Sequence, residues 1–209
     1  MTTKQAAKIG KELLPELPGF VAEGKMVFKS PVDNFLRALY FENTSNANRF
    51  HLWVFFLPLF PSRDSVSFNF GKRIGNALNW NIENPNLLAD LRAAIHGEAI
   101  PFLNKVSTLA GVVSYLKADI DVDRERVNPR TLEALAYTLI KSGDYSSALK
   151  VLDELDQRFS KSATPWVLEL VARVKSVEEK LLPKPEAALA QLEAWKAETI
   201  GKLRLEKYR

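Results

Sequence analysis

The side chains that most often carry catalysis or bind metals are scarce in this sequence. It contains no cysteine, and its two histidines, His51 and His96, lie too far apart in the chain to form a ligand-spaced pair. Without cysteine there are no thiolate nucleophiles, zinc–thiolate sites or disulfides. His51 falls in an apolar run, where a histidine beside the core is the simpler interpretation.

An aspartate-rich stretch has the spacing that opens a calcium-binding loop. Asp119, Asp121 and Asp123 alternate as the first ligands of such a loop do. However, Arg124 stands where the loop needs a glycine, and Arg130 stands where it needs its closing glutamate. The sequence therefore predicts no metal site.

A glycine-flanked basic segment follows an expected strand. The sequence Gly71-Lys72-Arg73-Ile74-Gly75 lacks the lysine–serine or lysine–threonine ending of a phosphate-binding loop and the spacing of a dinucleotide fingerprint. A turn that needs glycine where a strand ends explains it better. The chain also has no nucleophile motif such as GxSxG or SxxK. We therefore expect no cofactor and no catalytic residue.

Four residues are candidates for contacts with a partner. Lys72 and Arg73 are the best anion contacts. Trp80 lies between two asparagines in an expected loop, where it can anchor an interface or cover the edge of the sheet. Trp195 can pack inside the last helical hairpin or face a partner.

The net charge of +4 invites a nucleic-acid interpretation, so its distribution matters. The first 120 residues carry 13 basic and 10 acidic side chains, and the remainder carry 16 and 15, so neither part is a basic module. We expect a solvated surface with a slight excess of lysine and regard nucleic-acid binding as the alternative. That alternative would use Lys72, Arg73, Lys202, Arg204, Lys207 and Arg209.

The elements that must position these residues are organised around residues 49–60, the densest apolar run. Phe50, Leu52, Val54 and Phe56 alternate with Trp53, Phe55 and Leu57, so both faces of a strand here would be apolar and need cover. The run is too short to span a bilayer. We expect a central strand, with one face covered by helices at 85–117 and the other by the N-terminal helix, the C-terminal hairpins or a second copy.

The neighbouring patterns predict the fold class. Strand patterns at 25–30, 35–43 and 65–70 join the central run in a four-stranded antiparallel meander, and a helix is expected from Thr3. Residues 129–209 show only helical periodicity, interrupted by Gly143 and by prolines at 183 and 185. The prediction is an α+β fold with a sheet domain at 1–118, a charged connection at 119–128 and a helical hairpin region at 129–209.

Residues 129–195 resemble tetratricopeptide-like helical hairpins. Gly143 and Tyr145 stand at the turn positions of that motif, and a second, degenerate copy follows without the glycine–tyrosine turn. The resemblance implies a peptide-binding groove, whereas helical cover without a groove is the alternative for so few repeats. The large and small motif positions of the first copy are Leu132, Leu135, Ala136, Leu139, Ala148 and Leu152.

Residues 10–118 resemble small bacterial α+β domains of unknown function, some of them immunity-like. The shared outline is a leading helix, Gly19-Phe20 before a strand, Phe68-Asn69-Phe70-Gly71 at a strand end, and a later helix at Pro101-Phe102-Leu103. The resemblance implies partner binding and transfers no catalytic residue.

Together these observations predict a non-enzymatic protein-interaction or immunity-like protein. We expect its partner to be another protein or a second copy of the chain, with no membrane involved, and we expect a cytoplasmic location because the N-terminus lacks the apolar core of a signal peptide. Nucleic-acid binding and an enzyme with an unfamiliar site stay open as alternatives.

Overall fold

The computed structural model describes residues 1–75 and 79–209, which form two units by internal contacts. The sheet unit comprises residues 1–59, 63–104 and 200–209. The helical unit comprises residues 60–62 and 105–199. The chain is α+β with an antiparallel sheet and a mostly helical C-terminal region, which confirms the predicted fold class.

The sheet has six strands in the described residues, two more than the sequence predicts. They are β1 (Phe20–Glu23), β2 (Met26–Lys29), β3 (Phe35–Asn43), β4 (Arg49–Pro58), β5 (Gly71–Ile74) and β6 (Trp80–Asn81). Every pairing is antiparallel, in the order β1-β2-β3-β4-β5, and β6 pairs with the start of β4. The outer side of β4 is therefore shared between β5 and β6.

The alternation predicted for the central run is confirmed in β4. Phe50, Leu52 and Val54 belong to one apolar core cluster of the sheet unit, and Phe55 and Leu57 belong to another. All five are fully buried. We call the side of the sheet that carries Leu52 and Val54 the first face, and the side that carries Phe55 and Leu57 the second face.

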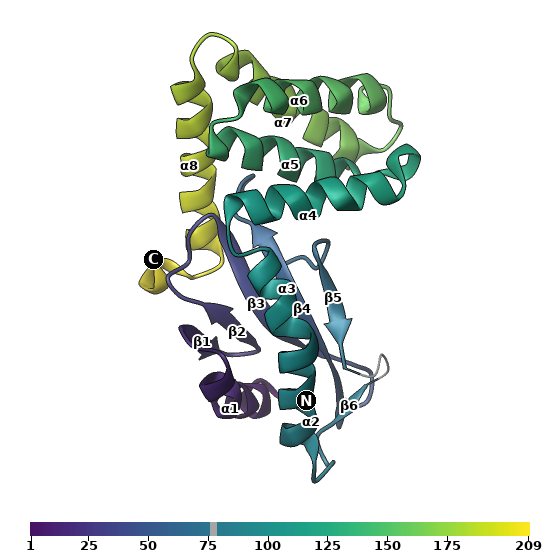
Figure 1. Cartoon of the computed structure of the whole chain (residues 1–209), viewed down its shortest axis with the longest axis vertical. Helices are drawn as coiled ribbons and strands as arrows, with labels where there is room; N and C mark the ends of the chain where they lie inside the picture. The colour runs from purple at the N-terminus through teal and green to yellow at the C-terminus, as the bar shows by residue number, and fades with distance from the viewer. Residues whose placement is uncertain (76–78) are drawn as a thin grey trace. The chain divides into compact units, whose positions relative to one another are not determined.

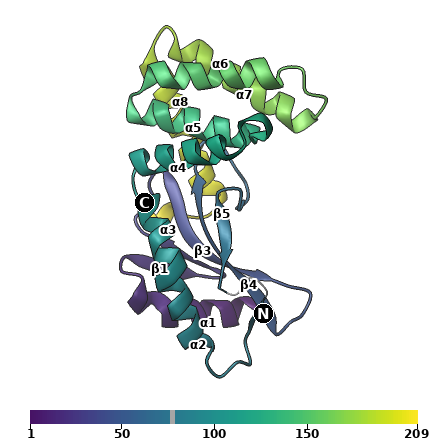
Figure 2. The same cartoon turned by 45° about the vertical axis from the view of Figure 1, so that its right-hand side comes forward.

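The first face is covered by helices from both ends of the sheet sequence. α1 (Thr3–Leu13) contributes Ala6 and Leu13, and α2 (Leu87–Ala94) contributes Leu87 and Leu91. A π-helical turn, η2 (Ile95–Ala99), and then α3 (Ile100–Lys105) continue α2. Figure 1 shows α2 and α3 running along the sheet, and Figure 2 shows α1 beside α2. The expected N-terminal helix is present, and the helical cover expected at 85–117 is present in the sheet unit only as far as Asn104.

The second face is covered by the last residues of the chain and by the segment that precedes β5. Ile200 and Leu205 are buried there, and Val66, Phe68 and Tyr208 pack against the same cluster. A short helical turn, η4 (Glu206–Tyr208), holds the end in place, since the Tyr208 carbonyl accepts a hydrogen bond from the Val32 N–H at 2.7 Å. Of the covers expected for this side of the central strand, the C-terminal segment supplies Ile200 and Leu205, whereas the N-terminal helix packs on the first face.

The strand predicted at 65–70 is wrong. These residues form turns and irregular backbone, and β5 begins immediately after them, at Gly71. Phe68 stacks on Trp53 at 4.8 Å between ring centroids, and Phe70 stacks on Phe56 at 5.2 Å. An aromatic at every second position therefore reflects a loop whose rings pack on the sheet, a pattern that the sequence cannot distinguish from a strand.

The helical unit is built from helices of 14 to 18 residues, and the final residues of the last helix belong to the sheet unit. The helices are α4 (Leu109–Val122), α5 (Pro129–Ser142), α6 (Tyr145–Phe159), α7 (Pro165–Leu181) and α8 (Pro185–Lys202), with short turns η1 (Leu14–Glu16) in the sheet unit and η3 (Arg124–Arg126) after α4. Gly143 ends α5 at a φ of 81°, where a side chain would be strained, and Asp144 caps α6. The predicted hairpin turn is therefore present.

The unit boundaries differ from the predicted ones. The boundary lies after Asn104 rather than at 118, and residues 200–209 belong to the sheet unit. The predicted connection at 119–128 begins as helix, because Val112, Leu116 and Ile120 carry one buried stripe through its acidic residues to the end of α4. In the described part of the chain, no single helix has the length and apolar character needed to cross a membrane, although α2–α3 and α4 would meet that test as a bent pair.

Candidate interaction sites

A pocket of about 520 Å³ lies in the sheet unit, where β4, β5 and β6 meet α2 and η2. We call it the Trp80 pocket. Its size falls in the range of pockets that hold small ligands or inserted side chains. Two of the predicted interaction candidates, Arg73 and Trp80, line it, and Lys72 contacts one of its walls through Glu98.

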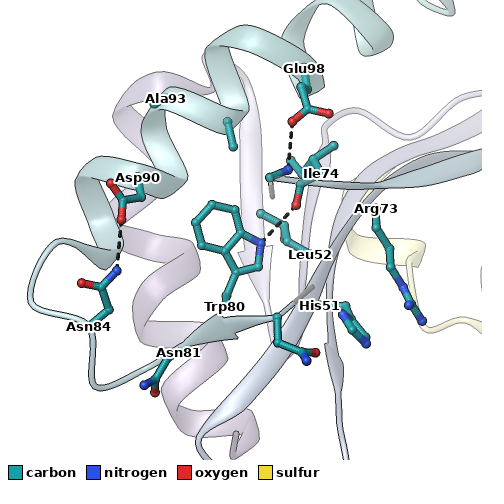
Figure 3. Close-up of a pocket in the computed structure, with 13 residues that line it drawn as sticks. His51, Leu52, Arg73, Ile74, Trp80, Asn81, Asn84, Asp90, Ala93 and Glu98 are labelled. Atoms are coloured by element: carbon teal, nitrogen blue, oxygen red, sulfur yellow. Dashed lines mark hydrogen bonds between the residues drawn. The ribbon is translucent and has the colours of Figure 1, made fainter. Parts of the chain in front are cut away.

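Trp80 is fixed at the centre of this pocket by a hydrogen bond and by close packing. Its indole N–H donates to the Ile74 carbonyl at 3.1 Å, and Leu52 and Ala93 lie on either side of the pocket (Figure 3). Gly75 has a φ of +76°, and a Cβ at this position would overlap the Trp80 ring. The glycine is therefore needed both for its backbone conformation and for the tryptophan's position.

Replacing Gly75 with alanine should disturb Trp80 directly. We expect Gly75→Ala to lower the free energy of unfolding by about 1–3 kcal/mol, from the left-handed backbone conformation and the collision with the ring. Urea unfolding would measure the change in stability, and the tryptophan fluorescence of the variant, compared with that of Trp80→Phe, would report the disturbance at Trp80. Gly97→Ala is the matched control, because no atom lies within 4 Å of its added Cβ. Equal effects at both glycines would contradict this role for Gly75.

Glu98 closes one side of the pocket and also protects the sheet edge. Its carboxylate accepts a hydrogen bond from the Gly75 N–H at 2.9 Å and pairs with Lys72 at 3.2 Å. β5 is the last strand of the main sheet order, so its outer side is an edge. A short edge strand with charged side chains and a carboxylate cap resists pairing with another chain.

Arg73 belongs to a stacked group beside the pocket. Its guanidinium lies over the Trp53 ring, 5.1 Å from the centroid. One oxygen of Glu42 accepts hydrogen bonds from the Arg73 guanidinium at 3.1 Å and from the Trp53 indole N–H at 2.8 Å. The predicted anion contact is therefore already paired with a carboxylate of its own chain.

Amide side chains line the other wall of the pocket. Asn84 donates to Asp90 at 3.0 Å, and the side-chain oxygen of Asn81 accepts from the Glu83 N–H at 3.0 Å. In Figure 3, Asn84 and Asp90 lie on one side of Trp80, and His51 and Arg73 lie on the other. The pocket thus presents a fixed aromatic ring between groups that can donate and groups that can accept hydrogen bonds.

The two histidines have separate environments. His51 lines the Trp80 pocket, whereas the His96 ring nitrogen lies 2.7 Å from Glu16, which also pairs with Arg92. Within residues 1–75 and 79–209, no cluster of three or more histidine, aspartate or glutamate side chains is placed to hold a metal ion.

The tryptophans of the helical unit have different environments. Trp195, the predicted candidate, is half-buried, with its ring 5.9 Å from that of the buried Tyr137. Trp166, at the start of α7, is 40% exposed and carries the Arg130 guanidinium over its ring at 4.8 Å. The sequence did not indicate Trp166, because it lies in the apolar pattern of α7, and that pattern does not show which apolar side chain is exposed.

Three of the six basic residues considered for nucleic-acid binding are paired with carboxylates of the sheet unit. Lys72 pairs with Glu98, Arg73 with Glu42, and Lys207 with Glu23 at 3.2 Å. Lys207 and the Tyr208 hydroxyl both contact Glu23, and the hydrogen bond from Tyr208 is the main cause of that carboxyl's lowered pKa. These pairs serve the fold of the sheet unit.

The sequence identifies part of the Trp80 pocket. Arg73 and Trp80 are predicted interaction residues, whereas the acidic residues Asp90 and Glu98, which α2 and η2 bring to the sheet edge, are not. No spacing rule connects them to β5.

No protein-family model, curated protein or solved structure matches this chain.

Proposed function

We propose that the chain is a non-enzymatic protein-interaction protein and that it binds a partner protein at the Trp80 pocket. The observation that carries this proposal is the pocket itself, in which a fixed tryptophan lies between asparagine amides and Arg73. Tryptophan and arginine are enriched among the residues that dominate binding energy. Asparagine amides supply adaptable hydrogen bonds around such rigid anchors.

The charges around the pocket support a binding role. Lys72 and Glu98 form one ion pair, and Arg73 and Glu42 form another. These two pairs cancel, and Asp90, which accepts a hydrogen bond from the neutral Asn84, adds one negative charge to the lining. The pocket therefore carries little net charge and suits a partner side chain that is neutral or amphipathic. The resemblance of residues 10–118 to immunity-like domains agrees with such a role, and we place the protein in the cytoplasm as part of the same proposal.

The tetratricopeptide-like interpretation enters the proposal in a restricted form. α5 is buried at eleven of its fourteen residues and contacts α4, α6 and α7. Its side chains are therefore engaged in packing and do not form the floor of a groove. We propose that the hairpins serve as a helical scaffold, with any partner contact made by residues at the helix ends.

Filling the pocket should remove partner binding. Ala93 lines it on α2 and is exposed, so Ala93→Arg should fill the pocket with little cost to folding. Affinity capture from the source cell with quantitative mass spectrometry should recover a partner with the wild type and lose it, by about tenfold or more, with Ala93→Arg. Ala89→Arg is the matched control on the same helix, since Ala89 is also exposed but does not line the pocket.

A partner that both variants retain would contradict binding at this pocket. Light scattering of the purified chain tests separately whether the partner is a second copy of the chain. A dimer that Ala93→Arg dissociates would identify the second copy as the partner. A further variant, His51→Gln, tests the alternative of catalysis, because His51 and Asp90 line one pocket and general acid–base chemistry uses such groups. Turnover abolished by His51→Gln would replace the binding proposal.

A further inference from the structure

Arg130 and Trp166 form a stacked pair at the starts of two helices. Arg130 lies in the first turn of α5, Trp166 in the first turn of α7, and the guanidinium lies 4.8 Å from the ring centroid. Trp166 is 40% exposed, so the pair is open to solvent. Stacking fixes the plane of the guanidinium and leaves the N–H groups on its edge available.

The sheet unit contains a similar arginine–tryptophan pair, in which a carboxylate of the chain contacts both side chains. Arg73 lies over Trp53 at 5.1 Å, and one Glu42 oxygen accepts hydrogen bonds from the guanidinium and from the indole N–H. The carboxylate therefore bridges the cation and the ring. Charge-assisted hydrogen bonds of this kind are about twice as strong as neutral ones.

A second arginine that stacks on an aromatic ring also pairs with an acidic residue. Arg158 lies over Phe159 at 5.6 Å and pairs with Glu154 at 3.1 Å. Arg130 differs from both. Across residues 1–75 and 79–209, it forms no ion pair with a carboxylate of this chain, and the Trp166 indole N–H donates no hydrogen bond.

We propose that Arg130 and Trp166 bind an acidic side chain of a partner protein, with its carboxylate bridging the guanidinium and the indole N–H as Glu42 does between Arg73 and Trp53. The site rests on the proposed interaction function but is distinct from the Trp80 pocket. Arginine and tryptophan are both among the side chains enriched at interface hot spots.

A protein carboxylate fits this site better than a nucleic-acid phosphate. Nucleic-acid binding needs a continuous run of unpaired basic side chains along the backbone. Here Arg124, a nearby arginine in sequence, pairs with Glu154 at 2.8 Å, and the exposed Glu169 follows Trp166 by one helical turn. One stacked cation can pair with one carboxylate, and Glu169, whose charge repels any anion, disfavours a polyanion more strongly than a single carboxylate.

The test uses two capped tripeptides with the full-length chain. One has glutamate between two leucines, and the other has glutamine in its place. The readout is the ¹⁵N–¹H signal of the Trp166 indole, assigned with Trp166→Phe. We expect a saturable shift with the glutamate peptide and none with the glutamine peptide. Arg130→Lys keeps the charge but loses the planar fork, so it should raise the Kd about tenfold.

Arg126→Lys is the matched control, since Arg126 is exposed and makes no ring contact; it should leave the shift unchanged. An equal response to both peptides, no response to either, or a response to inorganic phosphate in preference to the glutamate peptide would each overturn the proposal. The peptide response is independent of Ala93→Arg, so a failure here and a failure of the Trp80 pocket are distinguishable.

Discussion

Replacing Arg173 with methionine should destabilise the helical unit by about 3 kcal/mol, the lower end of the range for breaking a buried ion pair. Two guanidinium nitrogens of Arg173 on α7 lie 2.7 and 2.8 Å from the same carboxylate oxygen of Glu133 on α5. The Glu133 side chain is 2% exposed, whereas that of Arg173 is 31% exposed. The variant would remove the charge-assisted hydrogen bonds that Arg173 donates to a carboxylate buried between helices, where water cannot easily replace them.

The surroundings of Glu133 strengthen this expectation. Tyr137, one turn further along α5, is fully buried, and burial together with the Glu133 charge raises its pKa well above the usual range. The tyrosine therefore stays protonated at any ordinary pH and adds no second negative charge beside Glu133.

A matched lysine on the same helix separates this effect from the loss of any surface charge. Lys175 pairs with Asp156 at 3.0 Å and is 49% exposed, so Lys175→Met should cost less than about 1 kcal/mol. The double variant Glu133→Leu with Arg173→Met should recover much of the loss, since well-packed apolar residues can replace a buried pair. Urea unfolding followed by circular dichroism measures all three. Equal losses for Arg173→Met and Lys175→Met would refute the buried-charge argument.

The parts of the fold that the sequence predicts correctly are those with strong periodicity. The alternation of Phe50, Leu52 and Val54 with Phe55 and Leu57 identifies both buried faces of β4, and the turn at Gly143 follows from its local conformation. Such features are determined by residues that are close in the sequence. The features that the sequence predicts wrongly are determined by residues that are distant in the sequence and close in the fold.

The loop before β5 illustrates one such failure. Phe68 and Phe70 alternate as strand residues do, yet their rings stack on Trp53 and Phe56 from a turn. The acidic stretch after residue 118 illustrates another, since Ile120 continues the buried stripe of α4 among charged residues. In both cases tertiary packing decided between two structures that the same pattern allows.

The candidate sites divide in the same way. Trp80 and Arg73 are recognisable from their residue types, but Glu98 and Asp90 reach the pocket only through the path of α2 and η2. Trp166 is apolar in a helix, so its exposure depends on which side of α7 packs. Residue type indicates what a side chain can do, and the fold decides whether it is available.

The cover on the second face of the sheet leads to the other large expected effect. Leu205 is 2% exposed in the cluster of Phe55 and Leu57, although it lies only four residues from the C-terminal Arg209. Leu205→Ala should cost about 2–5 kcal/mol, the usual range for a buried leucine, because it opens a cavity against the central strand. The loss should appear as faster hydrogen exchange at the amides of β3 and β4.

An exposed leucine supplies the control. Leu182, at the end of α7, is 66% exposed, so Leu182→Ala should change the free energy of unfolding by no more than about 0.5 kcal/mol. If the chain end were only loosely attached, Leu205→Ala would behave like Leu182→Ala and exchange in β4 would be unchanged. A large loss at Leu205 alone, with exchange rising in β3 and β4, would mean that the sheet is completed by the last residues of the chain, and that a partner binding the second face would have to displace them.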